Sequence, residues 1–372
     1  MFKIIARYAR FILVLSSIPL SIFVFTCCSQ KATVTTTKSV DPPIAAPVQK
    51  ALALTGDSFR IAFYNVENLF DIYDDPITQD SEYLPNSKIQ WTQERYDKKL
   101  ANITKVIESM GFPSILGMCE IENRKVLEDL VNQPLIKAYN YDIAHFDSPD
   151  ERGIDVAMIY KKGDFEVKNK VKHSIKFVGN NDKTRDILEV TGILRGQPLT
   201  VFVNHWPSKS GGAAESEPKR VYVAEQLKSV VDALVKKDKS SQVVIMGDLN
   251  DEPDNISLTQ GLGAKDWVEN SDNTLTPNAL YNLASAIKKA DLGSYYYKKH
   301  WETIDQIIVS GNFLSKNSTL VTDKQQIFNA DFLTYLDKST GIRAPNRTYT
   351  GPVYRGGYSD HFPIFIQVYL KK

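Results

Sequence analysis

The segment Ser241-Gln-Val-Val-Ile-Met-Gly-Asp-Leu-Asn-Asp-Glu-Pro253 sets the organisation that we expect for this chain. Its apolar run, Val243 to Met246, is typical of a strand that is buried on both faces. The run stops at a turn that carries Asp248 and Asn250, so the strand would present a carboxylate and an amide at its carboxyl end. An acidic surface turn made of ordinary turn-forming residues is the alternative interpretation. The rest of the chain must decide between the two.

The composition is that of an ordinary globular protein that can bury a sizeable core. The chain has 372 residues, of which 42% are hydrophobic and 24% are charged. Its formal net charge is +1, from 45 basic and 44 acidic residues. This balance argues against a protein that holds a polyanion by bulk charge, although local basic patches are still allowed.

The amino terminus, residues 1–28, has the pattern of an export signal. Three basic residues precede an apolar run over 11–25, which is too short for a comfortable membrane span. Cys27 and Cys28 follow the run and resemble the lipidated cysteine of a bacterial lipoprotein signal, without indicating which one is used. A plain secretory signal or an uncleaved anchor is the alternative. We therefore expect an exported protein: a periplasmic, outer-membrane or cell-surface lipoprotein held to the membrane by its lipid, or otherwise a secreted protein.

The remaining sequence divides into a tether and one domain. Residues 29–56 are rich in Thr, Ala, Pro and Lys without apolar periodicity, which predicts a flexible tether. Residues 57–372 contain no repeat and no dividing linker, which predicts a single α+β domain that we expect to be a monomer. Cys119, the one cysteine of this domain, lies in an apolar run and is expected to be a small buried hydrophobe.

Helical and strand-like patterns alternate irregularly through the domain. We expect helices where apolar residues recur at helical spacing, over 92–111, 123–135 and 218–235. We expect strands at 59–65, 114–119, 154–160, 187–194, 199–204, 242–246, 303–309 and 362–369.

Polar residues that suit a reactive site better than a core stand at six of these strand ends. An acid at a strand end is usually just solvated, so each position alone is a weak signal. The same combination, an apolar run beside Asp, Asn, Glu or His, recurs along the chain, and this recurrence is a stronger signal of a site. The positions are Asn65, Glu120, Asn204-His205, Gly247-Asp248-Leu249-Asn250, Ile304-Asp305 and Ser359-Asp360-His361.

These positions resemble, in order, the motifs of the endonuclease/exonuclease/phosphatase superfamily, which includes deoxyribonuclease I, abasic-site endonucleases, inositol polyphosphate 5-phosphatases and bacterial sphingomyelinases. The resemblance spans residues 59–368. The phrases Tyr64-Asn-Val-Glu-Asn-Leu-Phe70 and Asn204-His-Trp-Pro-Ser208 resemble an exported bacterial branch. The resemblance implies a four-layer α/β/β/α sandwich of the deoxyribonuclease I type, with the site at one edge.

The candidate metal ligands are hard oxygen donors. Glu120 is the first candidate, with Asn65 and Asp360 nearby, and the resemblance implies the same set. Such donors suit Mg²⁺, which can neutralise phosphoryl and leaving oxygens, with Mn²⁺ and Ca²⁺ as alternatives.

The other site residues supply proton transfer and hydrogen bonds. Asp248 would orient or deprotonate the attacking water, and Asn250 would donate to a phosphoryl oxygen. His361 would contact the phosphoryl group, and Asp305 would bond its other ring nitrogen and raise its pKa, as the resemblance also implies.

Two further residues are expected to contact the substrate phosphate. His205 would be a second imidazole donor, although the sequence does not indicate its partner. Arg152 resembles the phosphate-binding arginine of the family, and a surface turn charge is the alternative.

An aromatic and basic cluster precedes the Asp305 strand. It could stack bases, grip a sugar or touch a lipid surface, or it could be an edge strand with ordinary packing. We expect the remaining histidines, His145, His173 and His300, to be surface residues. The cluster consists of Tyr295, Tyr296, Tyr297, Lys298, Lys299, Trp301 and Trp206.

Together these features predict metal-dependent hydrolysis of phosphate esters, by an exported endonuclease-like phosphodiesterase acting on nucleic acid. A phosphomonoesterase, or a hydrolase of phospholipids or inositol phosphates, is the alternative on the same fold. A lipid-anchored binding protein without catalysis is a further alternative.

Overall fold

The computed structural model describes residues 58–371 except 178, 180–181, 268–274, 316–317 and 323. The predicted signal (1–28) and tether (29–56) lie outside the described residues and stay predictions. Within the described part of the chain, no helix combines the length and apolar character needed to cross a membrane.

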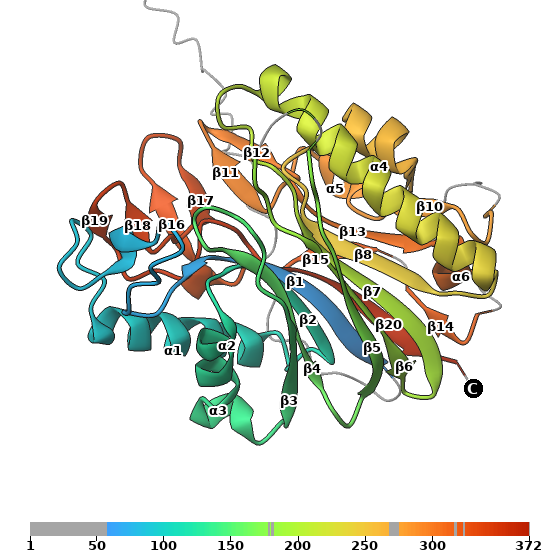
Figure 1. Ribbon diagram of the computed structural model, residues 1–372, viewed down its shortest axis with the longest axis horizontal. Coiled ribbons are helices and arrows are strands. Elements are labelled where there is room, and N and C mark those ends of the chain that lie inside the picture. The colour runs from blue at the N-terminus through green and yellow to red at the C-terminus, as the bar shows by residue number, and fades with distance from the viewer. Residues whose placement is uncertain are drawn as a thin grey trace, which may run out of the picture. The chain divides into compact units, whose positions relative to one another are not determined.

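Two seven-stranded sheets form the centre of the domain (Figure 1). Three neighbouring pairs are parallel, β1/β2, β7/β8 and β9/β10, and the other pairs within these sheets are antiparallel. The first sheet has the order β14 (Leu320–Val321), β20 (Ile364–Leu370), β1 (Ser58–Leu69), β2 (Ile115–Ile121), β4 (Asp155–Lys161) and β3 (Tyr141–His145), with β15 (Gln325–Ile327) also on β20. The second has the order β5 (Phe165–His173), β6 (Ile187–Leu194), β7 (Gln197–His205), β8 (Val243–Asp248), β13 (Asp305–Ser310), β10 (Leu280–Asn282) and β9 (Lys265–Asp266).

The two sheets pack face to face through alternating side chains. Successive residues of a strand point to opposite faces. In β1, Ile61 and Phe63 therefore join the layer between the sheets, whereas Ala62 and Tyr64 face the first helical layer. These central strands are apolar on both faces because both faces are covered.

Helices cover the two outer faces, which confirms the four-layer α/β/β/α sandwich. α1 (Gln93–Ser109), α2 (Arg124–Val131) and α3 (Pro134–Lys137) pack on the first sheet. α4 (Ala213–Lys237) and a π-helical turn at Ser257–Leu262 pack on the second, where Val223 and Leu227 meet Phe202 and Ile245. Figure 1 shows α4 along one outer face and α1 to α3 along the other.

Short elements complete the fold. They are α5 (Ser285–Lys289), α6 (Gly311–Leu314), 3₁₀ turns at Ser81–Tyr83 and Asp331–Leu333, and three hairpins: β11 (Tyr295–Tyr297) with β12 (His300–Glu302), β16 (Thr334–Asp337) with β17 (Ile342–Pro345), and β18 (Tyr349–Thr350) with β19 (Val353–Tyr354).

Some element bounds differ from the sequence prediction. The long helix begins at Ala213, so Pro218 lies inside it rather than at its start. The helix predicted over 123–135 is two helices, because Pro134 starts a new one at its first position. Strand β1 continues past Asn65 to Leu69 through a register shift, where Glu67 and Asn68 have φ of 53° and 57°.

Candidate active site

The predicted site residues come from strand ends that meet at one edge of the two sheets. β7 and β8 are parallel, so His205 lies opposite Asp248. β13 runs antiparallel to β8, so its first residue, Asp305, also lies opposite Asp248. His361 precedes β20, whose first residue pairs with Phe63 of β1. Carboxyl ends of parallel strands and the start of an antiparallel strand therefore bring distant residues together.

The side-chain amide of Asn65 lies at the centre of this group. Its Nδ2 donates to Asp248 Oδ2 at 3.1 Å and to Glu120 Oε1 at 3.4 Å, and lies 3.5 Å from His361 Nε2. Asn65 is 1% exposed, and its Oδ1 accepts from the backbone N–H of Glu67 at 3.0 Å. The acids, the amide and the imidazole that the sequence predicts for one site therefore lie together in one cluster.

His361 is held as a charged imidazolium by Asp305. Its Nδ1 lies 2.7 Å from Asp305 Oδ2, which also accepts from Ser294 Oγ at 2.5 Å. Burial lowers the pKa of His361, but the charge and hydrogen bond of Asp305 outweigh burial and raise that pKa well above its ordinary value. The Asp305 bond fixes the ring so that Nε2 faces Asp248 and Asn65. A proton donor is thereby aimed at the centre of the site.

Asp248 lies between two imidazoles. Its Oδ2 is 3.8 Å from His205 Nε2 and 3.8 Å from His361 Nε2. Burial, followed by the negative charge of Asp305, raises the pKa of Asp248 to about 7. A carboxylate with this pKa can accept a proton near neutral pH, which suits the expected general base.

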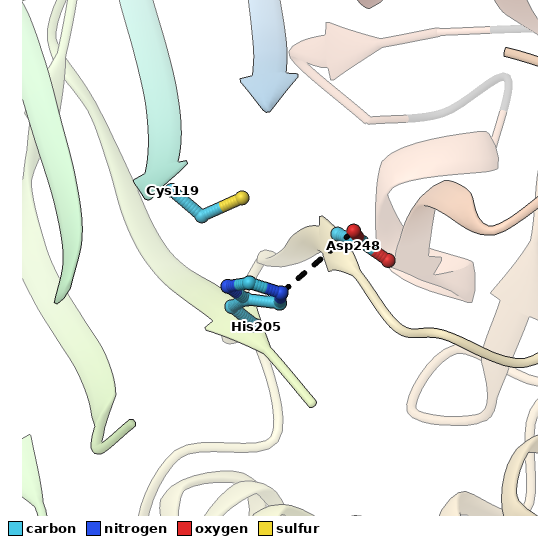
Figure 2. Close-up of side chains that lie close together, drawn as sticks. All are labelled: Cys119, His205 and Asp248. Atoms are coloured by element: carbon cyan, nitrogen blue, oxygen red, sulfur yellow. Dashed lines mark ion pairs between the residues drawn. The ribbon is translucent and has the colours of Figure 1, made fainter. Parts of the chain in front are cut away.

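His205 is a neutral imidazole beside a thiol. Figure 2 shows His205, from the end of β7, close to Cys119 of β2 and Asp248 of β8. Burial, and then the charges of Arg185 and Arg152, lower the pKa of His205. Its Nδ1 is buried and has no hydrogen-bond partner among the described residues. Cys119 is buried, as predicted, and burial raises the pKa of its thiol.

Asn250 is fixed beside Asp248 by two hydrogen bonds. Its backbone N–H donates to Asp248 Oδ1 at 3.0 Å, and its Nδ2 donates to the carbonyl oxygen of Trp206 at 3.0 Å. Its φ is 50°, a left-handed conformation that Asn tolerates better than most residues. One N–H of the amide is used by Trp206, and the other remains for the phosphoryl contact that we expect.

Arg152 lies at the rim, whereas Arg185 lies inside. The Arg152 side chain is 51% exposed and 3.5 Å from Asp150. Arg185 is 6% exposed and donates to the carbonyl oxygens of His205 at 3.1 Å and Trp206 at 2.6 Å. Among the described residues, Arg152 makes no hydrogen bond with the central cluster, although its charge lowers the pKa of His205. Arg185 therefore positions the His205 segment, whereas Arg152, half exposed beside Asp150, can meet a ligand at the rim.

Glu120 offers carboxylate oxygens that suit a hard divalent cation, whereas Asn65 turns its Nδ2 toward Glu120 and its Oδ1 toward the N–H of Glu67. Glu120, at φ 63°, directs Oε2 to the N–H of Asn68 and Oε1 to Asn65. Burial and the charge of Asp360 raise the pKa of Glu67 to about 7, although Arg347 pairs with both acids. A Mg²⁺ ion bound at Glu120 would supply charge neutralisation at phosphoryl and leaving oxygens. The ligand roles of Asn65, Glu120 and Asp360 stay predictions.

Other groups of ligand atoms suit such a cation less well. In the described residues, three groups have ligand atoms within 4.8 Å of one another, and Glu120 and Asp360 belong to none of them. These groups contain imidazole or thiol donors, which Mg²⁺ does not favour. They are Cys119 with His205 and Asp248, Asp248 with Asp305 and His361, and His145 with Asp147 and Asp155.

Sequence reasoning missed three residues that support the site. Glu67 accepts from Arg347 Nε at 3.4 Å, and Arg347 also pairs with Asp360 at 2.5 Å. Lys99 of α1 is 1% exposed and donates to Thr348 Oγ1 at 2.6 Å. Glu67 could have been found, because it lies two residues after Asn65 and shares its strand end. Lys99 and Arg347 carried no such signal.

Two minor expectations were wrong. The side chain of His145 is 2% exposed and bonds Asp155 at 2.9 Å, so it is not a surface residue. Trp206 is 1% exposed, and its Nε1 donates to Asn204 Oδ1, so it does not belong to the aromatic and basic cluster. Both side chains have a polar partner that permits burial.

A four-layer sandwich with acid, amide and imidazole groups at one edge defines a phosphoesterase. The chain belongs to the endonuclease/exonuclease/phosphatase family, whose sequence model matches residues 60–372. It is therefore a metal-dependent phosphate-ester hydrolase of that family. No curated protein matches the sequence.

Solved structures share the fold at low identity. The mannosyl-6-phosphatase of Bacteroides thetaiotaomicron is 16% identical with a TM-score of 0.53, covering 83% of this chain and 99% of that one. TDP2 of D. rerio, in complex with a single strand DNA product, is 13% identical with a TM-score of 0.52, covering 84% and 99%. The human Nocturnin catalytic domain is 15% identical with a TM-score of 0.50, covering 85% and 95%.

Proposed function

We propose that the protein is an exported, Mg²⁺-dependent phosphodiesterase that cleaves nucleic acid. The observation that carries this proposal is the presence of basic side chains on both flanks of the catalytic cluster. A polymer of phosphodiesters has charges on either side of the bond that is cleaved, whereas a small monoester does not.

The first flank is a cavity of about 460 Å³ beside His205. Arg185 links the cavity to the catalytic cluster, because it lines the cavity and also donates to the His205 carbonyl. Its basic lining residues are Arg152, Lys183, Arg185 and Lys219. Three acids, Asp150, Glu151 and Asp182, line the same cavity. Asp150 pairs with both Arg185 and Arg152, and Asp182 pairs with Lys219. Four basic residues against three acidic ones leave the lining with one surplus positive charge.

The second flank is the β11–β12 hairpin beside His361. Tyr295 forms a backbone bridge with His361, which fixes the hairpin at the site. The exposed residues Lys298 and Lys299 form its tip. A nucleic-acid strand that is bound across the catalytic cluster, from one flank to the other, would meet cations before and after the scissile phosphate.

In this proposal the chain's own groups share the chemistry. Asp248 accepts the proton of the attacking water, and the His361 imidazolium stabilises charge on the phosphoryl oxygens. The neutral His205 and the free N–H of Asn250 donate further hydrogen bonds. Arg152 contacts a phosphate at the rim.

A sugar phosphomonoesterase is the second candidate. Fold likeness does not decide between the two, because one neighbour is a mannosyl-6-phosphatase and another was solved with single strand DNA product. The two basic flanks favour the nuclease. Export rests on the signal pattern of residues 1–28, and a lipid anchor rests on Cys27 or Cys28.

An activity panel tests the function. The purified protein is incubated with DNA, RNA, mannose 6-phosphate, an inositol phosphate and sphingomyelin, with Mg²⁺, Mn²⁺, Ca²⁺ or EDTA. We expect Mg²⁺-dependent cleavage of nucleic acid, a loss of about 10²-fold or more in His361→Ala, and full activity in the matched variant His173→Ala. Hydrolysis of a monoester with no cleavage of DNA or RNA would exclude the nuclease.

Export and anchoring need their own experiment. Cell fractionation and mass spectrometry of the amino terminus would show a lipidated Cys27 or Cys28 in the membrane fraction. Changing both cysteines to serine would then release the protein from that fraction. An unmodified, full-length amino terminus in the cytoplasm would contradict export.

A further inference from the structure

A row of stacked rings leads from His361 to the surface. The ring centroids of His361 and Tyr295 are 4.5 Å apart with an interplanar angle of 24°. Tyr295 in turn stacks on Tyr297, at 5.9 Å and 15°. Burial and the charge of Asp360 raise the pKa of Tyr295, which is consistent with a phenol beside the site acids. Tyr297, at the outer end, is 46% exposed.

The hairpin uses its two faces differently. Tyr296 and Trp301 are directly opposite each other in register and pack together, and Trp301 stacks on Phe362. This face joins the core around the first helical layer. Side chains alternate along a strand, so Tyr295 and Tyr297 point to the other face. Packing therefore explains Tyr296 and Trp301 but leaves the exposed ring of Tyr297 without a structural role.

The tip of the hairpin is a tight, positively charged turn. Lys298 and Lys299 have φ of 46° and 71°, and they connect the paired residues Tyr297 and His300. Positive φ at both central residues is typical of a type I′ turn, where Asn and Gly are usual. The ammonium of Lys298 lies 5.1 Å from the centre of the Tyr297 ring. A flexible lysine over an exposed ring is easily displaced by a flat ligand.

The hairpin is fastened on both sides, so its distance from the catalytic cluster is fixed. Besides the Tyr295–His361 bridge, Phe362 N–H donates to the carbonyl oxygen of Ser294 at 2.8 Å. On the other side, Lys209 of the β7–α4 loop pairs with Glu302 at 2.9 Å. The Tyr297 ring thus sits at a set place relative to a phosphate bound at His361.

We propose that Tyr297, with Lys298 and Lys299, is a stacking subsite for an unpaired nucleobase next to the scissile phosphate. This inference rests on the proposed nuclease function and adds that single strands are the preferred substrate. A nucleobase continues the row of nearly parallel rings, and the displaced lysine can reach the adjacent phosphate. Stacking of bases on aromatic side chains beside basic residues is how proteins hold single strands. Paired bases in a duplex cannot present a face to the ring.

Binding in EDTA tests the subsite apart from catalysis. The probes are a single-stranded oligonucleotide, a duplex of the same sequence, and a strand of the same length whose bases are replaced by tetrahydrofuran abasic units. The abasic strand keeps every phosphate and lacks only the rings. We expect the wild-type protein to bind the base-bearing single strand most tightly. In Tyr297→Ala that affinity should fall by about 5- to 100-fold, to the level of the abasic strand.

Matched variants separate stacking from folding. Tyr297→Trp should keep or increase the preference for bases. Tyr369→Ala is the control, because Tyr369 is also 46% exposed but lies at the opposite end of β20. Equal affinity for base-bearing and abasic strands in the wild type, or an unchanged preference in Tyr297→Ala, would overturn the subsite.

The outcome for the subsite can be distinguished from the outcome for the nuclease. If DNA and RNA are cleaved without a preference for single strands, the subsite is wrong and the nuclease stands. If neither is bound or cleaved while a sugar phosphate or sphingomyelin is hydrolysed, both fail. Vesicles containing sphingomyelin, bound more weakly by Tyr297→Ala than by wild type, would assign the ring to a lipid surface instead.

Discussion

Asp305 controls the charge of two other site residues. It bonds His361 Nδ1 at 2.7 Å and lies opposite Asp248 across the β8–β13 pair. Its negative charge favours a proton on both neighbours, and it raises the pKa of His361 and of Asp248. One carboxylate therefore sets the upper and the lower limit of the pH range in which His361 is protonated and Asp248 is not.

Replacing Asp305 by Asn should move the pH–rate profile to lower pH. Activity in our mechanism needs protonated His361 and deprotonated Asp248. Without the Asp305 charge the pKa of His361 falls, so activity is lost at a lower pH on the alkaline side. The pKa of Asp248 falls as well, so the acid limb moves in the same direction. We also expect kcat/KM to drop by about 10²-fold or more, since the ring loses its orienting partner.

The measurement is kcat/KM from pH 5 to 10 for wild type and Asp305→Asn. Asp337→Asn, which changes a half-buried acid in β16, serves as the control and should leave the profile in place. An alkaline limb that stays where it is in the wild type would contradict the role of Asp305.

For single residues, the sequence predicted the site where polar side chains follow a recognisable pattern at strand ends. Asp305 and His361 could be placed at the site because each stands beside an apolar run at a strand end, and the family resemblance implied that they form a pair. Lys99 could not be predicted as a site residue, because its sequence pattern is that of a lysine on the polar face of a helix. Its partners, Thr348 and the carbonyl oxygen of Tyr358, are about 250 positions away in the chain. Only the fold makes it a buried cation beneath the site acids.

The parallel pair β7/β8 places His205 beside Asp248 because the strands approach closely at Gly247. A Cβ atom on Gly247 would lie 2.4 Å from the carbonyl oxygen of Asn204, which is shorter than any contact a real Cβ makes. Asn204 and Gly247 are opposite each other in register, one position before His205 and Asp248. A side chain at Gly247 would therefore push apart the two strand ends that carry catalytic groups.

Gly247→Ala should thus reduce both stability and activity. Overpacking a tight core position costs about 1–3 kcal/mol in the free energy of unfolding. Gly163→Ala is a matched control, because a Cβ there meets no atom within 4 Å. Denaturant unfolding and kcat should both change in the first variant, and neither by much in the second. A Gly247→Ala protein with wild-type stability would show that the strands can separate without cost.

Element bounds were predictable where periodicity was clear and failed at prolines. The apolar periodicity predicts a helix over 218–235. The chain instead begins α4 at Ala213, where Ser216 Oγ donates to the carbonyl oxygen of Gly212 at 2.7 Å. The hairpins between 331 and 354 gave no pattern that distinguishes them from loops. The bulge after Asn65 was also hidden, since a register shift depends on the neighbouring strand.

Several buried acidic side chains of the domain lie together at one edge of the sandwich. Glu67 and Asp248 are 8% and 3% exposed, and Asp360 lies beside both His361 and Glu67. Lys99 and Arg347 offset only part of this charge. A divalent cation that binds the folded state and not the unfolded chain would therefore stabilise the protein.

Adding Mg²⁺ should raise the thermal unfolding midpoint, and Glu120→Gln should abolish the rise. At a free Mg²⁺ concentration ten times its Kd, the expected gain is about 1.4 kcal/mol. The measurement is thermal unfolding with Mg²⁺ or EDTA, and it does not depend on activity. Glu128→Gln, on the exposed face of α2, is the control. An equal shift in Glu120→Gln and wild type would move the cation site away from Glu120.

The global fold could be predicted because its motifs occur in order over the whole domain and resemble those of a known superfamily. The strand count per sheet and the register could not, since these depend on which apolar runs pair. Substrate choice was least accessible. In our proposal it depends on the cavity beside His205, which is lined by segments distant in sequence, and on the place where the β11–β12 hairpin docks beside His361.

The shared amide of Asn65 gives the molecule its own spectroscopic reporter. In a ¹⁵N-labelled sample, the Nδ2 cross-peaks of this one side chain would respond to a cation at Glu120, to proton loss from Asp248 and to reorientation of the His361 ring. Cation binding, proton loss and ring reorientation, which a steady-state rate cannot separate, would then be observed individually in solution through a single nitrogen nucleus.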